Sequence, residues 1–366
     1  MMIRSFLSVG KGAFYCEQFK TDIFSEKINV IYDCGSLTDV RLVEQQIKRN
    51  FQRNETIHAL FISHLDEDHI NGLPFLLKYC RVKKIFFPLI TSADAKYIKL
   101  FNLITNRNSV TLQFLNNPYT AFRSWNVEWR PSLYQIRDNE ESDNNIDAIP
   151  ISSGEDVAHI IFEDESIIEQ KWLYIPYNFR RKSRIIQLQS ELNVRFGKDM
   201  SNEDLHDIWE NGSDTDRKNI KAAYQNVKGS LNTNSMTLYS GEDMSGGWQE
   251  IVCSPYNYIY PYHTEAGCLY TGDYDASGKD KWNDLFKAYN KVWNYIGCVQ
   301  VPHHGSRHNY NSELAKLHAY YMISAGAENG FYHPHAIVLK DLLFNRHHPY
   351  IVTEHKSSEV HLLVHI

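Results

Sequence analysis

The chain has 366 residues and a formal net charge of −6, with 43% hydrophobic and 22% charged residues, as is ordinary for a soluble globular protein. Its length suits one large domain or two ordinary ones, and its charge excludes a globally basic nucleic-acid binder. No apolar run approaches the roughly 18–20 residues of a transmembrane helix, and the N-terminal apolar stretch is too short for a signal peptide. The 6 cysteines are scattered without a C-x-x-C pair, which indicates reduced thiols and a cytoplasmic location.

The N-terminal part of the chain alternates strand-like and turn-like segments. Strands are predicted at 3–9, 12–19, 28–36 and 58–64, and helices at 41–51 and 73–80. Further strands are predicted at 83–90 and 109–115, around a helix near 93–106. A strand-rich opening with one crossover helix favours an α/β sandwich.

The middle of the chain differs in composition. An acidic stretch at 138–147 is predicted to be a loop, and 163–228 is charged and helical in pattern, with helices expected at 180–192 and 202–209. We interpret 163–228 as a helical insertion or cap within one domain that spans 1–366. Strand patterns return at 235–240, 250–256, 268–275, 297–306 and 320–326, followed by a helix at 336–344.

The segment FISHLDEDHING at 61–72 concentrates side chains that commonly bind metals: His64, Asp66, Asp68 and His69. They follow a short apolar run, so we expect them at the carboxyl end of a buried strand, where α/β folds build their sites. Alternate residues of an extended loop point the same way, so His64 and Asp66 can share one ion while Asp68 and His69 turn toward a second. The alternative is that these are polar loop residues that bind no metal, which suits a single such residue better than four together.

Two later strand ends carry similar chemistry. Asp273 follows a buried strand and a Thr-Gly turn, where a carboxylate bridging two ions could project, although aspartate after glycine is also common in turns. The next strand ends in His303, His304, a glycine and Ser306. Adjacent histidines at a strand end are candidate ligands, and surface histidines in a turn are the alternative.

Two further segments could contact a substrate. His333 and His335 flank a proline that keeps the backbone extended, so one imidazole could face the site and the other solvent. After the aromatic-rich segment 172–179 comes a basic cluster, which can hold a phosphate backbone or form a solvated helix start. The cluster consists of Arg180, Arg181, Lys182 and Arg184.

An ordered set of segments resembles the metallo-β-lactamase superfamily: SVGKGAFYCEQF, IYDCGS, SHLDEDHINGLPFLL, NTNSMTLYSG, YTGDYD, VPHHGS, ISAG and HPH. Within that superfamily the chain most resembles the soluble hydrolase domain of ComEC-type competence nucleases and their stand-alone relatives. The resemblance covers about 1–135 and 228–366 and leaves the insertion unexplained. It implies an αββα sandwich with a dinuclear metal site at one edge.

The resemblance also implies a role for each matching residue. His64 and Asp66 would bind the first ion, Asp68 and His69 the second, and Asp273 both, while one of His303 or His304 would complete the second site. Asp33 matches a buried aspartate that orients the His-Asp loop by hydrogen bonds. Asn234 stands where a lactamase carries a histidine.

Two departures from the superfamily pattern affect the choice of metal. The common H-x-H-x-D-H signature is H-x-D-x-D-H here, with Asp66 in place of an imidazole, and Asn234 replaces a further histidine. Such a site is rich in oxygen ligands, which suits Mn²⁺ or Mg²⁺ relatively better, while the imidazoles keep Zn²⁺ as a candidate.

These observations predict a dinuclear-metal nuclease or phosphodiesterase that cleaves DNA with a hydroxide held between two divalent ions. Asp68 would orient the hydroxide or accept its proton, His335 or His333 would assist the leaving oxygen or hold a phosphate, and Ser306 would bond a phosphate oxygen. The net charge of −6 favours the alternative of a small-molecule phosphodiester or ester hydrolase. A third reading is a non-catalytic subunit of a bacterial defence complex. Beyond DNA, the expected partners are another protein or a second copy bound through the insertion, with no membrane contact.

Overall fold

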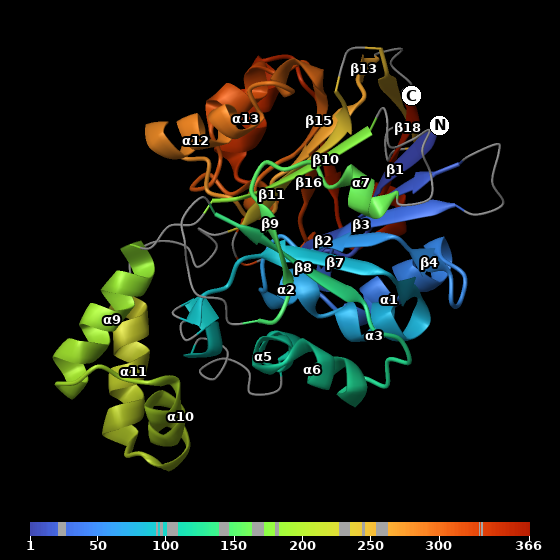
Figure 1. The fold of residues 1–366 in the computed structure, drawn as a ribbon. Coiled ribbons are helices and arrows are strands. Elements are labelled where there is room, and N and C mark those ends of the chain that lie inside the picture. The colour runs from blue at the N-terminus through green and yellow to red at the C-terminus, as the bar shows by residue number, and fades with distance from the viewer. Residues whose placement is uncertain are drawn as a thin grey trace.

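The structure is a computed structural model that describes residues 1–20, 27–92, 94–95, 98–100, 109–138, 146–162, 172–179, 183–226, 235–243, 246–253, 263–328, 330 and 332–366. Within these ranges, two large sheets face each other and carry helices on their outer sides (Figure 1). The N- and C-termini lie close together, because the first and last strands pair with each other. The predicted αββα sandwich is therefore confirmed.

The larger described sheet is mixed: its N-terminal strands pair antiparallel, and the strands from β3 onward pair parallel. The residues of β3 are buried throughout, because this strand lies in the middle of the sheet between two layers. In spatial order the sheet consists of β13 (Thr264–Glu265), β12 (Trp248–Cys253), β18 (Val360–His365), β1 (Met2–Phe6), β2 (Gly12–Phe19), β3 (Ile28–Ser36), β5 (Ala59–Phe61), β7 (Lys84–Pro88), β8 (Ser132–Arg137) and β9 (Ile149–Ser152).

The second described sheet has six strands, and its last four are parallel. In spatial order they are β10 (Trp172–Asn178), β11 (Met236–Glu242), β14 (Gly267–Tyr270), β15 (Ile296–Gln300), β16 (Tyr320–Ser324) and β17 (Pro349–Val352). A separate pair joins β4 (Thr56–Ile57) and β6 (Arg81–Val82).

Helices cover both outer faces of the sandwich (Figure 1). Beside the larger sheet lie α1 (Val40–Asn50), α2 (Glu67–Ile70), α3 (Leu73–Tyr79), α5 (Val110–Asn116) and α6 (Pro118–Ser124). Beside the smaller sheet lie α12 (Lys279–Tyr289) and α13 (Ala336–Phe344). The remaining helices are α7 (Ala158–Ile161), α9 (Ser183–Phe196), α10 (Asn202–Asn211) and α11 (Asp214–Asn226), with short 3₁₀ turns at Trp293–Tyr295, His303–Gly305, Ser312–Lys316 and Lys356–Ser358.

The apolar core has a layer between the sheets and a layer beneath each set of helices. Between the sheets, the rings of Tyr15, Tyr32 and Tyr270 stack on one another. Their hydroxyls make polar contacts inside the core: that of Tyr32 donates to the Met236 carbonyl, and that of Tyr15 donates to Ser324 Oγ. This packing holds together strands that come from distant parts of the sequence.

Two sequence predictions differ from the structure. The segment 109–115, predicted as a strand, forms helix α5, because the Ser109 side chain accepts a hydrogen bond from the Leu112 amide and so caps the helix. The predicted helical insertion at 163–228 contains β10, which pairs along its whole length with β11. The described helices of this segment are α9, α10 and α11.

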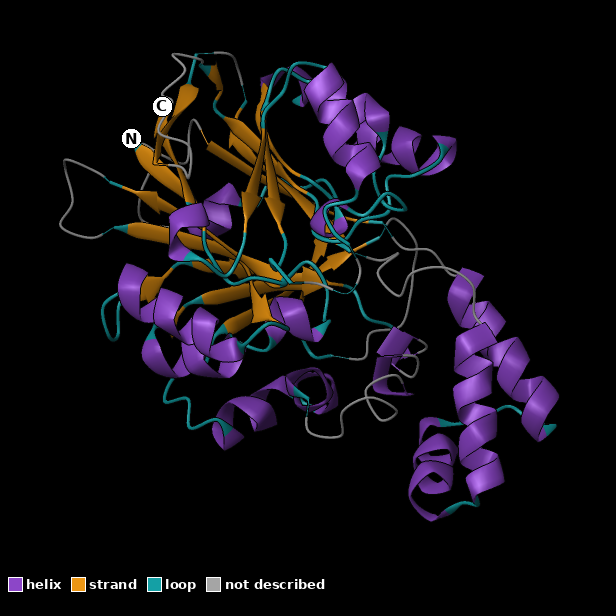
Figure 2. Cartoon of the chain, turned by 180° about the vertical axis from the view of Figure 1, so that it is seen from behind, coloured by secondary structure: helices purple, strands orange, loops and turns teal. Residues whose placement is uncertain are grey.

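Helices α9, α10 and α11 stand apart from the two sheets (Figure 2). They share an apolar cluster that includes Leu188, Leu192 and Trp209 together with Leu100 from outside the insertion. The Ser201 side chain caps α10 in a reciprocal pair of hydrogen bonds with Asp204, as the sequence predicts. Among the described residues, no helix combines the length and apolar character needed to cross a bilayer.

Candidate metal centre

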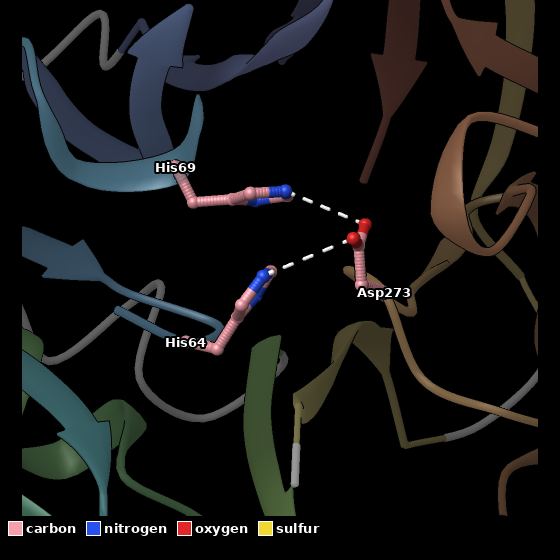
Figure 3. Close-up of side chains that lie close together, drawn as sticks. All are labelled: His64, His69 and Asp273. Carbon is pink, nitrogen blue, oxygen red and sulfur yellow. Dashed lines mark ion pairs between the residues drawn. The ribbon is translucent and has the colours of Figure 1, made fainter. Parts of the chain in front are cut away.

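The chemically active side chains of the two sheets meet at one edge of the sandwich. His64 and His69 follow β5, whereas Asp273 follows β14 in the other sheet and points at both imidazoles (Figure 3). His303 and His304 follow β15, the parallel neighbour of β14. Because parallel strands end at the same edge, residues far apart in the sequence converge there.

Asp273 lies at the centre of this cluster. Its Oδ1 atom is 3.4 Å from His69 Nε2, and its Oδ2 atom is 3.8 Å from His64 Nε2 (Figure 3). The Oδ2 atom is also 3.4 Å from His303 Nε2. Asp66 joins the Oδ2 side, with its own Oδ2 atom 3.7 Å from His64 Nε2. The two oxygens of one carboxylate thus face different sets of imidazoles, as a bridging ligand would.

A second group lies on the other side of His69. Asp68 Oδ2 is 3.3 Å from His304 Nε2, and both side chains are buried. The potential ligand atoms of Asp68, His69 and His304 lie within 4.8 Å of one another, and so do those of His64, His69 and Asp273. The structure therefore brings together all seven residues that the sequence proposes as ligands.

Asp33 and Ser63 hold two of the imidazoles in place. The Asp33 carboxylate accepts hydrogen bonds from the Ser63 amide at 2.7 Å and hydroxyl at 2.8 Å, and it lies 2.7 Å from His69 Nδ1. A carboxylate accepts, so His69 Nδ1 carries the proton. The Ser63 hydroxyl gives its hydrogen to Asp33, so at 2.9 Å it accepts from Nδ1 of His64. Asp33 is held at φ 58°, a left-handed conformation that aspartate tolerates better than most residues.

The tautomers decide what the site can bind. With Nδ1 protonated in neutral His64 and His69, the Nε2 lone pairs face the carboxylates, and neither Nε2 atom makes a hydrogen bond within the described structure. His304 also carries a proton on Nδ1, because that atom is 2.8 Å from the Ser324 carbonyl, which can only accept, but its Nε2 lies within hydrogen-bond distance of Asp68 Oδ2 at 3.3 Å. The lone pairs of His64 and His69, which face carboxylate oxygens across 3.4–3.8 Å, are placed to share a cation with those oxygens. The residues thus fit divalent ions with mixed nitrogen and oxygen ligands.

The carboxylates of the site differ in how their surroundings affect their pKa. Burial and the nearby carboxylates of Asp68 and Asp273 raise the pKa of Asp66 to about 7, although its side chain keeps 28% exposure. Burial also acts to raise the pKa of Asp68, but His304 and His69 outweigh it and hold that pKa below its usual range. The crowding at Asp66 is what a bound cation would relieve.

The pKa values of two of the histidines are shifted in opposite directions. Burial and the neighbouring His69 lower the pKa of His64 to about 3. For His69, burial acts to lower the pKa, but the carboxylates of Asp33 and Asp273 raise it above its usual value. The Nε2 side of His69, next to Asp273, is therefore a favourable position for a cation.

The other predicted site residues are distributed unevenly. The His333 ring lies 5.8 Å from that of His303, and burial together with His303 and His304 lowers the pKa of His333 to about 4. His335 is not brought into either group; it caps α13, where its Nδ1 accepts from the Ile337 amide. Ser306 is 3% exposed and its hydroxyl accepts from the His308 amide, and its bond to a phosphate oxygen stays a prediction.

Part of the prediction falls outside the described residues. The predicted site residues outside the described ranges are Arg180, Arg181, Lys182 and Asn234. Arg184 lies in the first turn of α9.

Sequence reasoning missed several supporting residues. Besides Ser63, Gln300 holds the turn before Asp273: its Oε1 accepts from the amides of Thr271 and Gly272 at 2.8 and 2.7 Å. Gly272 adopts φ +52°, and a Cβ atom there would lie 2.5 Å from Ser235 Oγ and 2.7 Å from Ser63 Cβ. Polar residues in buried strands, such as Gln300, were the available signal.

The comparisons with known proteins agree with this architecture. Residues 23–98, which carry the His-Asp loop, match the model of the metallo-beta-lactamase superfamily. The chain has the metallo-β-lactamase fold. No curated protein matches its sequence.

Solved structures with low similarity include lactamases. MEM-A1, a subclass B3 metallo-beta-lactamase from a soil metagenome library, is 11% identical with a TM-score of 0.31 over 85% of this chain and 80% of that chain. The Rm3 metallo-beta-lactamase is 9% identical with a TM-score of 0.29 over 86% and 80%. MIM-1 from Novosphingobium pentaromativorans is 10% identical with a TM-score of 0.28 over 82% and 76%. Similarities this low carry no argument about the substrate.

The metallo-β-lactamase fold implies divalent metal ions, and the superfamily consists mostly of metal-dependent hydrolases. The number of ions, their identity and the closeness to ComEC-type nucleases stay predictions.

Proposed function

We propose that this metallo-β-lactamase-fold chain is a dinuclear-metal phosphodiesterase whose substrate is DNA. The observation that carries the proposal is the arrangement around Asp273, whose two oxygens face different imidazoles at 3.4 and 3.8 Å. One carboxylate between two donor groups is what a pair of adjacent ions requires. Asp66, in place of an imidazole, adds an oxygen donor that suits ions active in phosphoryl chemistry.

Divalent ions bound here would lower the pKa of a water molecule and stabilise negative charge on the phosphate oxygens. The chain itself supplies position and charge. Asp33 and Ser63 keep the lone pairs of His64 and His69 directed at the ions, because their hydrogen bonds hold the proton on each Nδ1 atom. Asp68, whose pKa is held low mainly by His304 against the effect of burial, stays ionised and can orient the attacking water.

His333 is the candidate contact to the substrate. It is half-buried beside His303, and burial with the neighbouring histidines lowers its pKa to about 4. At neutral pH such an imidazole is uncharged, so it would donate a hydrogen bond to a phosphate oxygen and would not act as a strong acid. His335, which caps α13, is left out of this proposal.

The choice of DNA is supported by the sequence resemblance to ComEC-type nucleases. The net charge of −6 favours the second candidate, hydrolysis of a small phosphodiester or ester, because a negatively charged chain gains less from a polyanionic substrate.

A substrate and metal panel tests both candidates. The chelator-treated chain is supplied with Mn²⁺, Mg²⁺ or Zn²⁺ and incubated with linear, circular and single-stranded DNA and with bis(p-nitrophenyl) phosphate. Asp273→Asn should reduce hydrolysis to the level of the metal-free chain. The matched control Asp280→Asn makes the same change at an exposed position in the first turn of α12, and it should retain activity.

Cleavage of DNA that depends on added metal would support the nuclease. Hydrolysis of bis(p-nitrophenyl) phosphate without DNA cleavage would replace it with the small-molecule enzyme. Metal binding without hydrolysis of any of these substrates would favour a non-catalytic subunit, and full activity of Asp273→Asn would overturn the two-ion scheme.

A further inference from the structure

The adjacent histidines after β15 point at different carboxylates. His303 Nε2 lies 3.4 Å from Asp273 Oδ2, whereas His304 Nε2 lies 3.3 Å from Asp68 Oδ2. Both histidines have left-handed backbone conformations, with φ of 47° and 55°. Their rings lie 5.8 Å apart and are inclined at 65°. Two adjacent non-glycine residues in such a conformation are strained. This backbone directs the two imidazoles at different carboxylates, whereas the sequence alone does not show which of them binds which ion.

Asn309 determines which nitrogen of His303 carries the proton. Its Nδ2 atom is 3.0 Å from the Asp273 carbonyl oxygen, which can only accept a hydrogen bond. The amide is therefore oriented with Oδ1 toward His303 Nδ1, at 2.9 Å. Because Oδ1 is also only an acceptor, Nδ1 of His303 must donate. The lone pair of neutral His303 is then on Nε2, which faces Asp273 Oδ2.

The same oxygen of Asp273 faces His64. Asp273 Oδ2 is 3.8 Å from His64 Nε2, and His64 Nε2 is in turn 3.7 Å from Asp66. The other oxygen, Oδ1, faces His69, whose ligand atom lies within 4.8 Å of those of Asp68 and His304 and also of those of His64 and Asp273. The two oxygens of Asp273 thus face different imidazoles, His69 lies between the two groups, and the two adjacent histidines face different carboxylates.

We propose that His303 and His304 bind different ions, with His303 completing the first ion beside His64 and Asp66, and that Asn309 is the residue that positions His303. The inference rests on the proposed function, because it requires the chain to hold two ions. It gives the first ion a second imidazole, although Asp66 and Asn234 stand where the superfamily has histidines. His304 completes the second ion with Asp68 and His69.

Metal stoichiometry tests the division between the histidines. The full-length chain is stripped with a chelator, titrated with Mn²⁺ and separately with Zn²⁺ by calorimetry, and analysed for bound metal. The wild type should bind two ions per chain, and His303→Ala and His304→Ala should each bind one. His355→Ala removes an exposed imidazole far along the chain and serves as the control that should still bind two.

A second set of variants isolates the role of Asn309. Asn309→Leu removes the acceptor for His303 and should weaken one of the two ions about tenfold or more, the effect expected for loss of a group that orients a ligand. Asn309→Asp keeps the acceptor for His303 but loses the donor to the Asp273 carbonyl, so it should recover part of the affinity that Asn309→Leu loses. Asn311→Leu is the matched control: Asn311 lies in the same loop and donates to the Ala276 carbonyl, but no hydrogen bond joins it to a histidine among the described contacts.

The tautomer itself can be observed without metal or activity. Long-range ¹H–¹⁵N spectra of the histidine-labelled, metal-free chain should show His303 protonated at Nδ1 in the wild type and in Asn311→Leu, but a mixture of tautomers in Asn309→Leu. Thermal unfolding of each metal-free variant checks that the fold is retained. If Asn309→Leu does not fold, the comparison of Asn309→Asp with the wild type still tests the assignment.

Three results would overturn the inference. Two ions retained by His303→Ala with unchanged affinities would overturn it alone and leave the proposed function standing. An unaltered His303 tautomer and unchanged metal affinities in Asn309→Leu would remove the role of Asn309. A wild-type chain that binds no Mn²⁺ or Zn²⁺ would overturn the proposed function together with the inference.

Discussion

A buried ion pair between the sheets provides the sharpest test of how the sandwich is stabilised. Arg4 on β1 and Glu17 on β2 are paired across the strands, with Arg4 Nε 2.8 Å from Glu17 Oε1, and they are 0% and 2% exposed. Arg4 also donates to Gln249 Oε1 and to the carbonyls of Ala266 and Ser240. Because Gln249 lies in the larger sheet and Ser240 in the smaller one, the pair connects both sheets.

The change Glu17→Gln removes the charge and keeps the shape. Besides Arg4, the Glu17 carboxylate accepts from the hydroxyls of Tyr174, Tyr270 and Ser240 at 2.6, 2.9 and 2.7 Å. These hydroxyls can rotate to suit an amide, so the principal loss is the charge opposite a buried guanidinium. At an effective dielectric of about 20, two unit charges this close attract by about 6 kcal/mol. Since the neutral hydrogen bond remains, we expect a loss of about 3–5 kcal/mol.

Thermal unfolding of the chelator-treated chain, followed by circular dichroism, measures this loss. With an unfolding entropy of about 2.1 cal/mol/K per residue, the chain of 366 residues has about 0.8 kcal/mol/K, so Tm should fall by about 4–6 °C. Combining Arg4→Met with Glu17→Gln should cost at least about 2 kcal/mol less than the sum of the single changes, because no buried charge is then left alone. A Tm within 1 °C of wild type for Glu17→Gln, or additive single changes, would refute this reasoning.

Three further changes test the carboxylates. The Glu359 carboxylate accepts a hydrogen bond from Ser8. Burial acts to raise the pKa of Glu359, but hydrogen bonds from His361, Ser8 and Gln46 lower it to about 2. The ionised carboxylate therefore stabilises the fold above the ordinary pKa of 4.5, and this stabilisation is lost as the pH falls toward 2. Glu359→Gln should therefore cost about 2 kcal/mol in urea unfolding at pH 7 and little at pH 2.5, and an equal cost at both pH values would contradict this. For Asp66, burial and neighbouring carboxylates raise the pKa from 3.8 to about 7, so the stability of the fold falls as the pH rises between these values. The metal-free Asp66→Asn variant should therefore have a higher Tm than the wild type at pH 8 and an equal Tm at pH 4. The same variant should bind metal less well. Asp33→Asn keeps a residue that tolerates the φ of 58° but removes the charge beside His69, so Mn²⁺ affinity should fall about tenfold or more in a titration; unchanged affinity would mean that only the hydrogen bonds matter.

Local patterns predicted most of the elements correctly. Helices α1, α3, α10 and α13 follow their apolar spacing and caps closely. The segment 109–115 was misread because a short apolar run fits a strand and a buried helix equally, and only the Ser109 cap separates the two. The strand β10 was assigned to the helical insertion because its pairing partner, β11, follows it only after the three insertion helices.

The chemistry of the His-Asp loop can be predicted from the sequence, because its four side chains are so close along the chain that any fold keeps them together: His64, Asp66, Asp68 and His69. The residues that complete the site depend on how distant segments pack. Asp273 reaches the loop because β14 belongs to the facing sheet, and Asn309 selects the lone pair of His303 through a contact with the Asp273 backbone. Strand order and the orientation of a buried amide depend on contacts between distant segments, and no spacing along the chain encodes them.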